Sequence, residues 1–211
     1  MESPTARRPG APRTVFRTEQ LSPKEAYDVL SAVVVPRPIA FITTVSPEGI
    51  VNAAPYSFFN VINEDPPMVA FSAAMGAGGK KDTVLNIEIT NEFVVNVVTE
   101  AILDQVVETS ARYPRTVSEI DVTHLRTAPS TVVHPPRVAD SPVGLECRLW
   151  RQIPLKKDGR ILTIGTVVVI HVDDALLTAG KVDVTKLNAI GRLSDDWFVP
   201  TTQRIKKKIP K

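Results

Sequence analysis

Short runs of apolar and β-branched residues, separated by turn residues, occupy most of this chain and indicate strands rather than long helices. Six such runs are predicted as strands: 39–45, 51–60, 67–73, 93–98, 145–153 and 161–172. Turn residues at 46–49 make 38–60 a predicted hairpin, and Lys157-Asp158-Gly159 joins the last two strands in the same way. The pattern therefore predicts a mainly β fold, a β-barrel with short helices.

Three segments have helical signals, and none alternates with the strands as a doubly wound sheet requires. Ser22 and Glu25 form a predicted capping box with Pro23 at the first helical position, opening a helix over 22–32. A second helix is expected over 83–89, capped by Asp82 and ended by Asn91. Residues 101–112 carry apolar side chains at helical spacing.

The remaining segments lack a clear period. We expect residues 1–14 to form a disordered tail, 15–200 to form one domain, and 201–211 to form a basic tail. Within the domain, the Pro-rich stretch 114–142 is expected to wrap the surface, and 188–199 is expected to be irregular.

Composition narrows the class of protein. The chain has 211 residues, of which 43% are hydrophobic and 23% charged, as in ordinary globular domains. No apolar run approaches the roughly 20 residues that cross a bilayer, and the N-terminus lacks the apolar core of a secretory signal. Cys147 is the only cysteine, which excludes an intrachain disulfide and a cysteine metal cluster. These features predict a cytoplasmic protein without a membrane span.

The net charge of +2 is unevenly distributed along the chain. Residues 201–211 contain five basic residues and no acid, and residues 1–20 contain four Arg against two Glu, so the segment between them is mildly acidic. Basic ends can bind nucleic acid, but no aromatic residues are interleaved to stack on bases. Solvated tails are therefore the favoured interpretation, and a nucleic-acid partner is not expected.

The segment 52–60 is an unusual strand because Pro55 cannot donate to a ladder. It must lie at an edge, at a bulge or where another group approaches the backbone. Ala53 and Ala54 leave room for a flat ligand, and Asn52 and Ser57 supply polar contacts. A ligand-free irregular edge strand is the alternative.

The segment 75–83 is a Gly-rich loop that leads through Lys80 and Lys81 into a predicted helix. Free N–H groups, the positive end of the helix dipole and an ammonium group together suit a phosphate. The loop is neither a Walker A motif, because Asp82 follows Lys81, nor GxGxxG. A solvated loop before a capped helix is the alternative.

The histidines give little sign of a catalytic or metal site. His124, His134 and His171 are far apart, with no metal-binding spacing and no nucleophile elbow, so a metal site is not expected. His171 is expected to be structural, and Cys147 to be an inert core residue.

The ordered set of segments resembles the flavin reductase-like family, which includes flavoredoxins and nitrilotriacetate monooxygenase component B. The resemblance covers about 36–193. It rests on the segments 37–45, 52–59, 65–67, 81–87, 92–96, 135–138, 141–147 and 191–193, together with Gly165.

This resemblance implies an FMN-binding split β-barrel, a homodimer, and FMN near the dimer interface. Carried over by position, Asn52, Ala53, Ala54 and Tyr56 would lie along the isoalloxazine ring. Ser57, Lys81 and Thr83 would hold the phosphate with Asn86 nearby, and Arg37 and Arg192 complete the candidate set.

One position departs from the family pattern. Short-chain flavin reductases carry a Gly-Asp-His motif associated with NADH use, and Arg160 takes the place of its histidine here. The first hypothesis is an FMN-dependent oxidoreductase that takes electrons from NAD(P)H or from a redox protein. The alternatives are a non-catalytic, flavoredoxin-like electron carrier or FMN-binding module, and a ligand-binding barrel without flavin.

Overall fold

The computed structural model describes residues 10, 12–76, 78–156, 159–208 and 210. The chain divides into two compact units, Met1–Val34 and Val35–Lys211. The first contains the short helix η1 (Thr18–Gln20) and helix α1 (Pro23–Val33). The predicted capping box is confirmed, since Ser22 Oγ accepts from the Glu25 N–H and the Glu25 carboxylate accepts from the Ser22 N–H. Residues 1–9 and 11 of the predicted tail lie outside the described residues.

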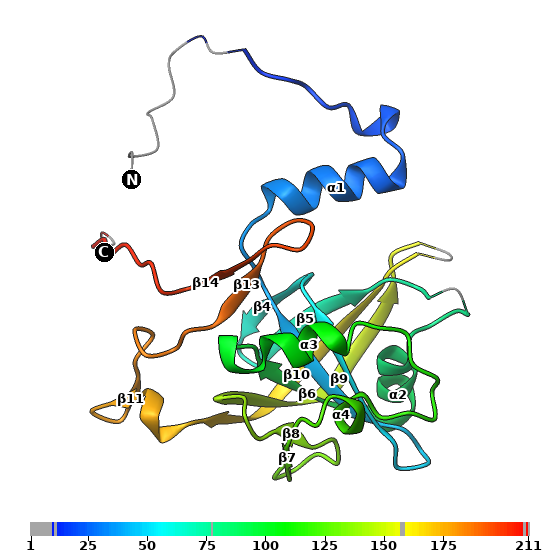
Figure 1. Ribbon diagram of the computed structural model, residues 1–211, viewed down its shortest axis with the longest axis vertical. Helices are drawn as coiled ribbons and strands as arrows, with labels where there is room; N and C mark the ends of the chain where they lie inside the picture. The colour runs from blue at the N-terminus through cyan, green and yellow to red at the C-terminus, as the bar shows by residue number, and fades with distance from the viewer. Residues whose placement is uncertain (1–9, 11, 77, 157–158, 209, 211) are drawn as a thin grey trace. The chain divides into compact units, whose positions relative to one another are not determined.

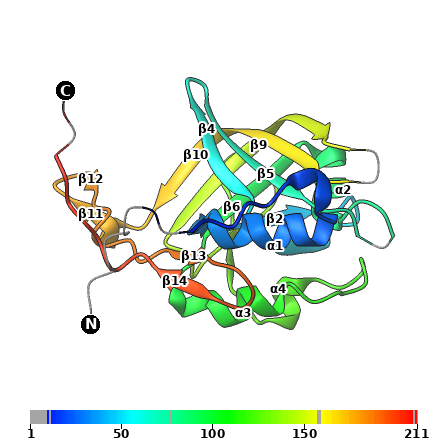
Figure 2. The ribbon, with the colours of Figure 1, turned by 90° about the horizontal axis from the view of Figure 1, so that it is seen from above.

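The second unit is built on a seven-stranded antiparallel sheet that curls into a barrel (Figures 1 and 2). Its strands follow the order β3-β2-β6-β9-β10-β5-β4. Their bounds are β2 (Ala40–Val45), β3 (Val51–Tyr56), β4 (Phe59–Glu64), β5 (Pro67–Ala73), β6 (Glu92–Val97), β9 (Val143–Pro154) and β10 (Ile161–Val172). The predicted mainly β barrel is thus confirmed, as are both hairpins. Residues 157 and 158 of the predicted second turn lie outside the described residues.

The prediction of one strand over 51–60 was wrong. The chain turns at Ser57 and Phe58, so β3 pairs with β2 while β4 pairs with β5 on the opposite side of the sheet. β3 and β4 are consequently the two edges, and they remain joined by two residues of chain. Alternation of side chains could not reveal this break, because both halves are equally compatible with a strand.

Small sheets lie around the barrel where no strand was predicted. In the segment 188–199, expected to be irregular, β13 (Ile190–Arg192) pairs with β1 (Arg37–Pro38) and with β14 (Phe198–Pro200). The long segment 114–142 contains helix α4 (Glu119–Val122) and the pair β7 (Thr127–Ala128) and β8 (Arg137–Val138). Farther on lie η3 (Asp174–Leu176), β11 (Leu177–Thr178) and β12 (Lys181–Val182).

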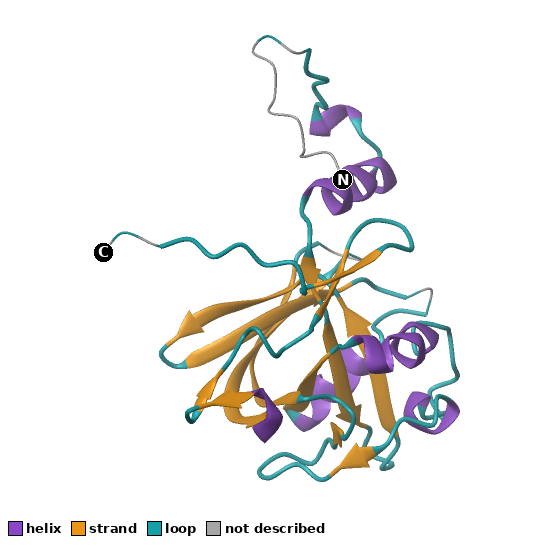
Figure 3. Ribbon diagram, turned by 60° about the vertical axis from the view of Figure 1, so that its left-hand side comes forward, coloured by secondary structure: helices purple, strands orange, loops and turns teal. Residues whose placement is uncertain are grey.

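The helices of this unit are short and lie outside the sheet (Figure 3). Helix α2 (Asp82–Thr90) ends at Asn91, which adopts a left-handed conformation with φ 59°, as predicted. The prediction that Asp82 caps it was wrong, because Lys81 is the N-cap residue and Asp82 already belongs to the first turn. The predicted helix 101–112 is present in part, as η2 (Glu100–Ile102) followed by α3 (Leu103–Glu108).

Two apolar cores stabilise the second unit. The barrel interior contains Phe71 and Phe93 in edge-to-face contact, with ring centroids 5.9 Å apart. Gly165 faces Phe93 so closely that a Cβ at this position would lie 2.4 Å from the Phe93 ring, which excludes any larger residue without repacking. Cys147 is fully buried in the same core, as expected, and burial raises the pKa of its thiol.

Candidate functional site

The strand predicted to lie along a ring, β3, is an edge strand of the barrel. The Ala53 N–H points away from β2 and donates to Glu119 Oε2 at 3.0 Å. Because backbone groups alternate in direction along a strand, the nitrogen of Pro55 lies on the same outer side. The absence of a donor at Pro55 therefore costs no ladder hydrogen bond, and the predicted edge position is confirmed.

A buried polar network joins β3 to the start of helix α2. The Asn52 Oδ1 accepts from Thr83 Oγ1 at 2.6 Å and from Thr44 Oγ1 at 3.3 Å, while its Nδ2 donates to Glu119 Oε1 at 2.9 Å. All four residues are buried. The Thr83 hydroxyl, predicted to hold a phosphate, is thus used inside the protein to fix Asn52.

The network continues along helix α2 to an arginine. The Asn86 Nδ2 donates to Thr44 Oγ1 at 3.0 Å, and its Oδ1 accepts from Arg115 Nη2 at 3.2 Å. Arg115 Nη1 also donates to Asp82 Oδ1 at 3.2 Å. The predicted residues Asn52, Thr83 and Asn86 therefore form one cluster, completed by Glu119 and Arg115, which the sequence did not single out. Both come from the Pro-rich stretch, where no period or motif marked them.

Glu119 is a buried acidic residue in this cluster. Burial raises the pKa of the Glu119 carboxyl, and the hydrogen bonds from the Ala53 N–H and the Asn52 amide act in the opposite direction. A side chain that accepts from a strand backbone and from Asn52 together holds both in one orientation. Glu119 is thus a positioning residue for β3.

Tyr56 lies mostly inside the barrel. Its ring centroid is 4.9 Å from that of Phe71, and only 6% of the residue is exposed. Its hydroxyl is buried and has no hydrogen-bond partner within the described ranges, and burial raises the pKa of the phenol. The Lys81 Nζ lies 5.8 Å from the ring centroid, so Tyr56 supports the side chain of Lys81.

Arg37 and Ser57 form a second group at the end of β3. The buried Arg37 donates from Nε to Ser57 Oγ at 3.3 Å and from Nη2 to the Leu193 carbonyl at 2.6 Å. The β1–β13 register places Arg37 opposite Arg192, the third predicted residue here. Arg192 donates to the Asp195 carbonyl, and its guanidinium lies 4.4 Å over the Phe198 ring.

Arg160 lies beside this second group. Its Nη1 donates to the Ser72 carbonyl at 2.8 Å, and its guanidinium carbon is 4.2 Å from the centroid of the Phe58 ring. Since Phe58 directly follows Ser57, the residue that departs from the family pattern is adjacent to the candidate site.

The start of helix α2 has the chemistry that a phosphate requires. Lys81 is exposed at the N-cap position, where the first N–H groups of the helix lie. Its neighbour Lys80 pairs with Glu88 at 2.6 Å, whereas Lys81 forms no ion pair with any described residue. On the adjacent strand Ala54 is small and half-buried, whereas Ala53 is fully buried in an apolar core. Lys81, the start of α2 and Ala54 therefore fit a phosphate-bearing planar ligand.

Two other kinds of site were searched for. Among the described residues, no three His, Cys, Asp or Glu side chains are grouped closely enough to hold a metal ion. No helix in the described part of the chain is both long and apolar enough to cross a membrane.

Comparison with known proteins connects this geometry to one family. Residues 32–185 match the family model described as a flavin reductase like domain. The uncharacterized protein YwrF of Bacillus subtilis is 42% identical over 190 residues, covering 87% of this chain and 93% of that protein.

Solved structures have the same fold over nearly the whole chain. Nitrilotriacetate monooxygenase component B from Bacillus cereus is 33% identical with a TM-score of 0.89, covering 94% of this chain and 100% of that one. The 2-nitrobenzoate 2-nitroreductase of Pseudomonas fluorescens is 32% identical with a TM-score of 0.86, covering 93% and 96%. A Shewanella frigidimarina structure described as having a split barrel domain is similar in fold, with a TM-score of 0.78 at 22% identity. The predicted split β-barrel is confirmed.

Proposed function

Because the chain belongs to the flavin reductase-like family, we propose that it binds FMN and transfers electrons through it from a reduced donor to an acceptor. The observation that carries the proposal is the exposed Lys81 at the start of α2, which lies over Tyr56 of strand β3. A site for a phosphate and a strand with two consecutive alanines are thus adjacent.

In this proposal FMN, when bound, supplies the hydride and one-electron chemistry, and the protein supplies binding and orientation. Lys81 and the first N–H groups of α2 hold the phosphate, and the half-buried Ala54 lies along the ring, next to the fully buried Ala53. Asn52, Thr83 and Asn86 act as positioning residues, because they use their polar groups on one another. Arg37 orients Ser57 in the same way.

A non-catalytic electron carrier is the second candidate. It is favoured by Arg160, which stands where short-chain reductases of the family carry a histidine associated with NADH. Arg160 has no imidazole to present to a nicotinamide. Its guanidinium is held against Phe58 and Ser72. The two candidates share one flavin site and differ only in the electron donor.

An anaerobic absorbance titration tests the function. We expect the purified protein to bind FMN. We also expect NADH or NADPH to bleach the absorbance bands of the bound flavin. Bleaching only by a chemical or protein reductant would favour the carrier. Arg160→His is then expected to introduce or accelerate bleaching by NADH, and Arg151→Gln, an exposed arginine elsewhere on the barrel, serves as the matched control. A protein that takes up no FMN would contradict both candidates.

We also propose that the protein forms a homodimer through the outer side of strand β4. Val61 and Ile62 on this edge strand are 67% and 49% exposed, and on β9 and β10 Trp150 and Ile170 are 53% and 60% exposed. Exposed apolar residues on an unpaired strand favour association with another chain.

Light scattering after size-exclusion chromatography tests the dimer. We expect a mass twice the 23.0 kDa of the chain, and we expect Val61→Lys to shift the protein toward monomer by burying a charge in the interface. Val107→Lys on helix α3, where Val107 is 46% exposed, is the control and should leave the mass unchanged. A wild-type mass of one chain would exclude the dimer.

A further inference from the structure

Arg115 lies where the Pro-rich stretch 114–142 meets the start of helix α2. Its Nη1 donates to Asp82 Oδ1 at 3.2 Å, and its Nη2 donates to Asn86 Oδ1 at 3.2 Å. Asp82 and Asn86 are four positions apart in α2, so their side chains lie one turn apart on the same side of the helix. One guanidinium thus spans the first turn of the helix whose N–H groups are proposed to hold a phosphate.

The carboxylate of Asp82 opposes an anionic ligand at this end of the helix. It follows Lys81 directly, and its side chain is 32% exposed, so burial does not suppress its charge. An acid in the first turn interacts favourably with the helix dipole, but it repels any other anion that binds there. A phosphate monoester carries close to two negative charges at neutral pH, which strengthens this repulsion. A phosphate site therefore requires that the charge of Asp82 be offset.

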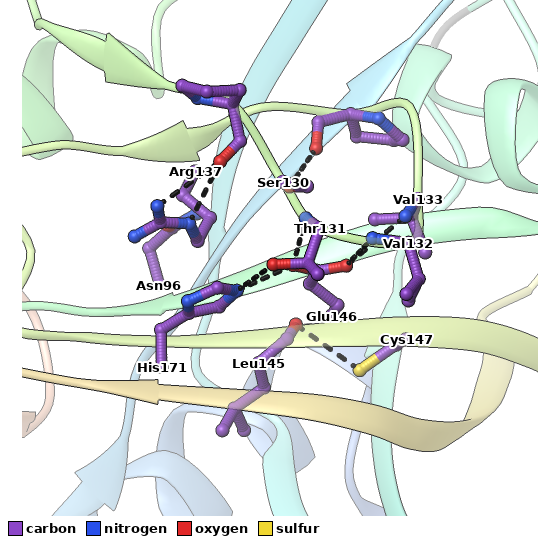
Figure 4. Close-up of polar contacts among 12 residues, drawn as sticks. Asn96, Ser130, Thr131, Val132, Val133, Arg137, Leu145, Glu146, Cys147 and His171 are labelled. Carbon is purple, nitrogen blue, oxygen red and sulfur yellow. Dashed lines mark hydrogen bonds and ion pairs between the residues drawn. The ribbon is translucent and has the colours of Figure 1, made fainter.

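Another carboxylate of the barrel, Glu146, shows how such a charge is offset without a cation from a distant segment. Glu146 is fully buried and accepts from the N–H groups of residues 131–133 at 2.6 to 3.2 Å, and its Oε1 lies 2.5 Å from His171 Nε2 (Figure 4). Asp82 differs, because within the described ranges its carboxylate accepts from the guanidinium of Arg115 and from no backbone N–H group. Compensation of the Asp82 charge thus depends on Arg115.

The ion pairs around the start of α2 leave one positive charge for a ligand. Lys80 pairs with Glu88 and Arg115 pairs with Asp82, whereas Lys81 pairs with no acid in the described part of the chain. Three cations against two carboxylates give these five residues a net positive charge of one. Without Arg115 the two signs would cancel, and the carboxylate next to Lys81 in the sequence would be left uncompensated.

Glu119, the other carboxylate of the cluster, is held by strand β3. Its oxygens accept from Asn52 Nδ2 at 2.9 Å and from the Ala53 N–H at 3.0 Å, so it does not depend on Arg115. We propose that Arg115 is a positioning residue that neutralises Asp82 and thereby makes the start of α2 selective for a flavin that carries a phosphate. This inference rests on the proposed function, because it concerns the same phosphate site.

Fluorescence titrations of the full-length protein with FMN and with riboflavin test the inference. We expect Arg115→Gln to weaken FMN binding by about fivefold, because the uncompensated Asp82 then repels the phosphate. Riboflavin has no phosphate, so its affinity should stay within about twofold of wild type. Arg115→Lys keeps the charge and should retain FMN binding. Arg126→Gln breaks the exposed pair of Arg126 with Asp140 in the same Pro-rich stretch, and as the matched control it should change neither affinity.

Asp82→Asn separates charge neutralisation from a loss of structure. Asn keeps an oxygen that can accept from Arg115 while the negative charge is removed. We expect this variant to bind FMN about threefold more tightly than wild type, and the double variant Asp82→Asn with Arg115→Gln to return to within about twofold of wild type. General loss of structure cannot tighten binding.

Two results would overturn the inference and leave the proposed function intact. One is an FMN affinity that is unchanged in both single variants. The other is a double variant that binds FMN no better than Arg115→Gln alone, because the lost contact with Asn86 would then explain the effect. A wild-type protein that binds no FMN would contradict the proposed function as well.

Discussion

Lys81→Ala is expected to weaken FMN binding by about tenfold or more, the loss of one charge-assisted hydrogen bond to a phosphate. The ammonium of Lys81 has no acidic partner within the described ranges, so all of its charge is available to a ligand at the start of α2. A titration of FMN followed by flavin fluorescence measures the effect. The difference from wild type should shrink as salt is added, because screening weakens an exposed charge pair.

Two controls separate a phosphate contact from a general loss of binding. Lys80→Ala removes the adjacent ammonium, which is already paired with Glu88 at 2.6 Å, and should change the FMN affinity by less than about twofold. Riboflavin has the same ring without a phosphate, so Lys81→Ala should leave its affinity unchanged. Equal FMN affinities of Lys81→Ala and wild type would show that Lys81 does not contact the phosphate.

The second large effect is expected in the stability of the fold at acid pH. Burial works against the charge on Glu146, but the N–H donors of residues 131–133 and His171 outweigh it and lower the pKa of the carboxyl to about 2. A lowered pKa in the folded state stabilises it at every pH above the unfolded value of about 4.5. This contribution, about 3 kcal/mol, is lost as the pH falls from about 4.5 to about 2.

Urea unfolding of wild type and Glu146→Gln at several pH values tests this account. The variant should be less stable by about 3 kcal/mol at pH 7, and the difference should shrink toward pH 2, where the wild-type carboxylate is protonated. Glu88→Gln, on the surface of α2, should change stability by less than about 1 kcal/mol. A difference that does not depend on pH would mean that the ionised form of Glu146 has no special role.

Elements with local signals could be predicted from the sequence. The β-branched run of β10 and the capping box of α1 specify their own structure, and the observed bounds agree closely with the prediction. β4 was missed because the turn at Ser57 and Phe58 carries no residue that marks the end of a strand, so the apolar run continues through it without a break. The three-residue strand β13 exists because Gly191 allows close approach to Pro36, which no local period reveals.

The residues of the candidate site could likewise be predicted only in part from the sequence. Asn52, Thr83 and Asn86 were predicted through family resemblance, and the structure brings them into one hydrogen-bonded cluster. Glu119 and Glu146 were missed, although each organises a region of the barrel. A single acidic residue acquires such a role only when the fold buries it against backbone N–H groups, so its position in the sequence carries no local signal.

The carboxylate of Glu119 also bears on whether strands of other chains can add to the sheet. It occupies the outer side of β3, where the backbone of an incoming strand would otherwise dock, and Pro55 removes a further donor from that side. β4, the other edge, carries neither device and exposes Val61 and Ile62. At the β3 edge of the seven-stranded sheet, the addition of a strand from another chain is therefore blocked. Repeated strand addition, which leads to fibrils, is prevented in this sheet once the β4 edge is covered.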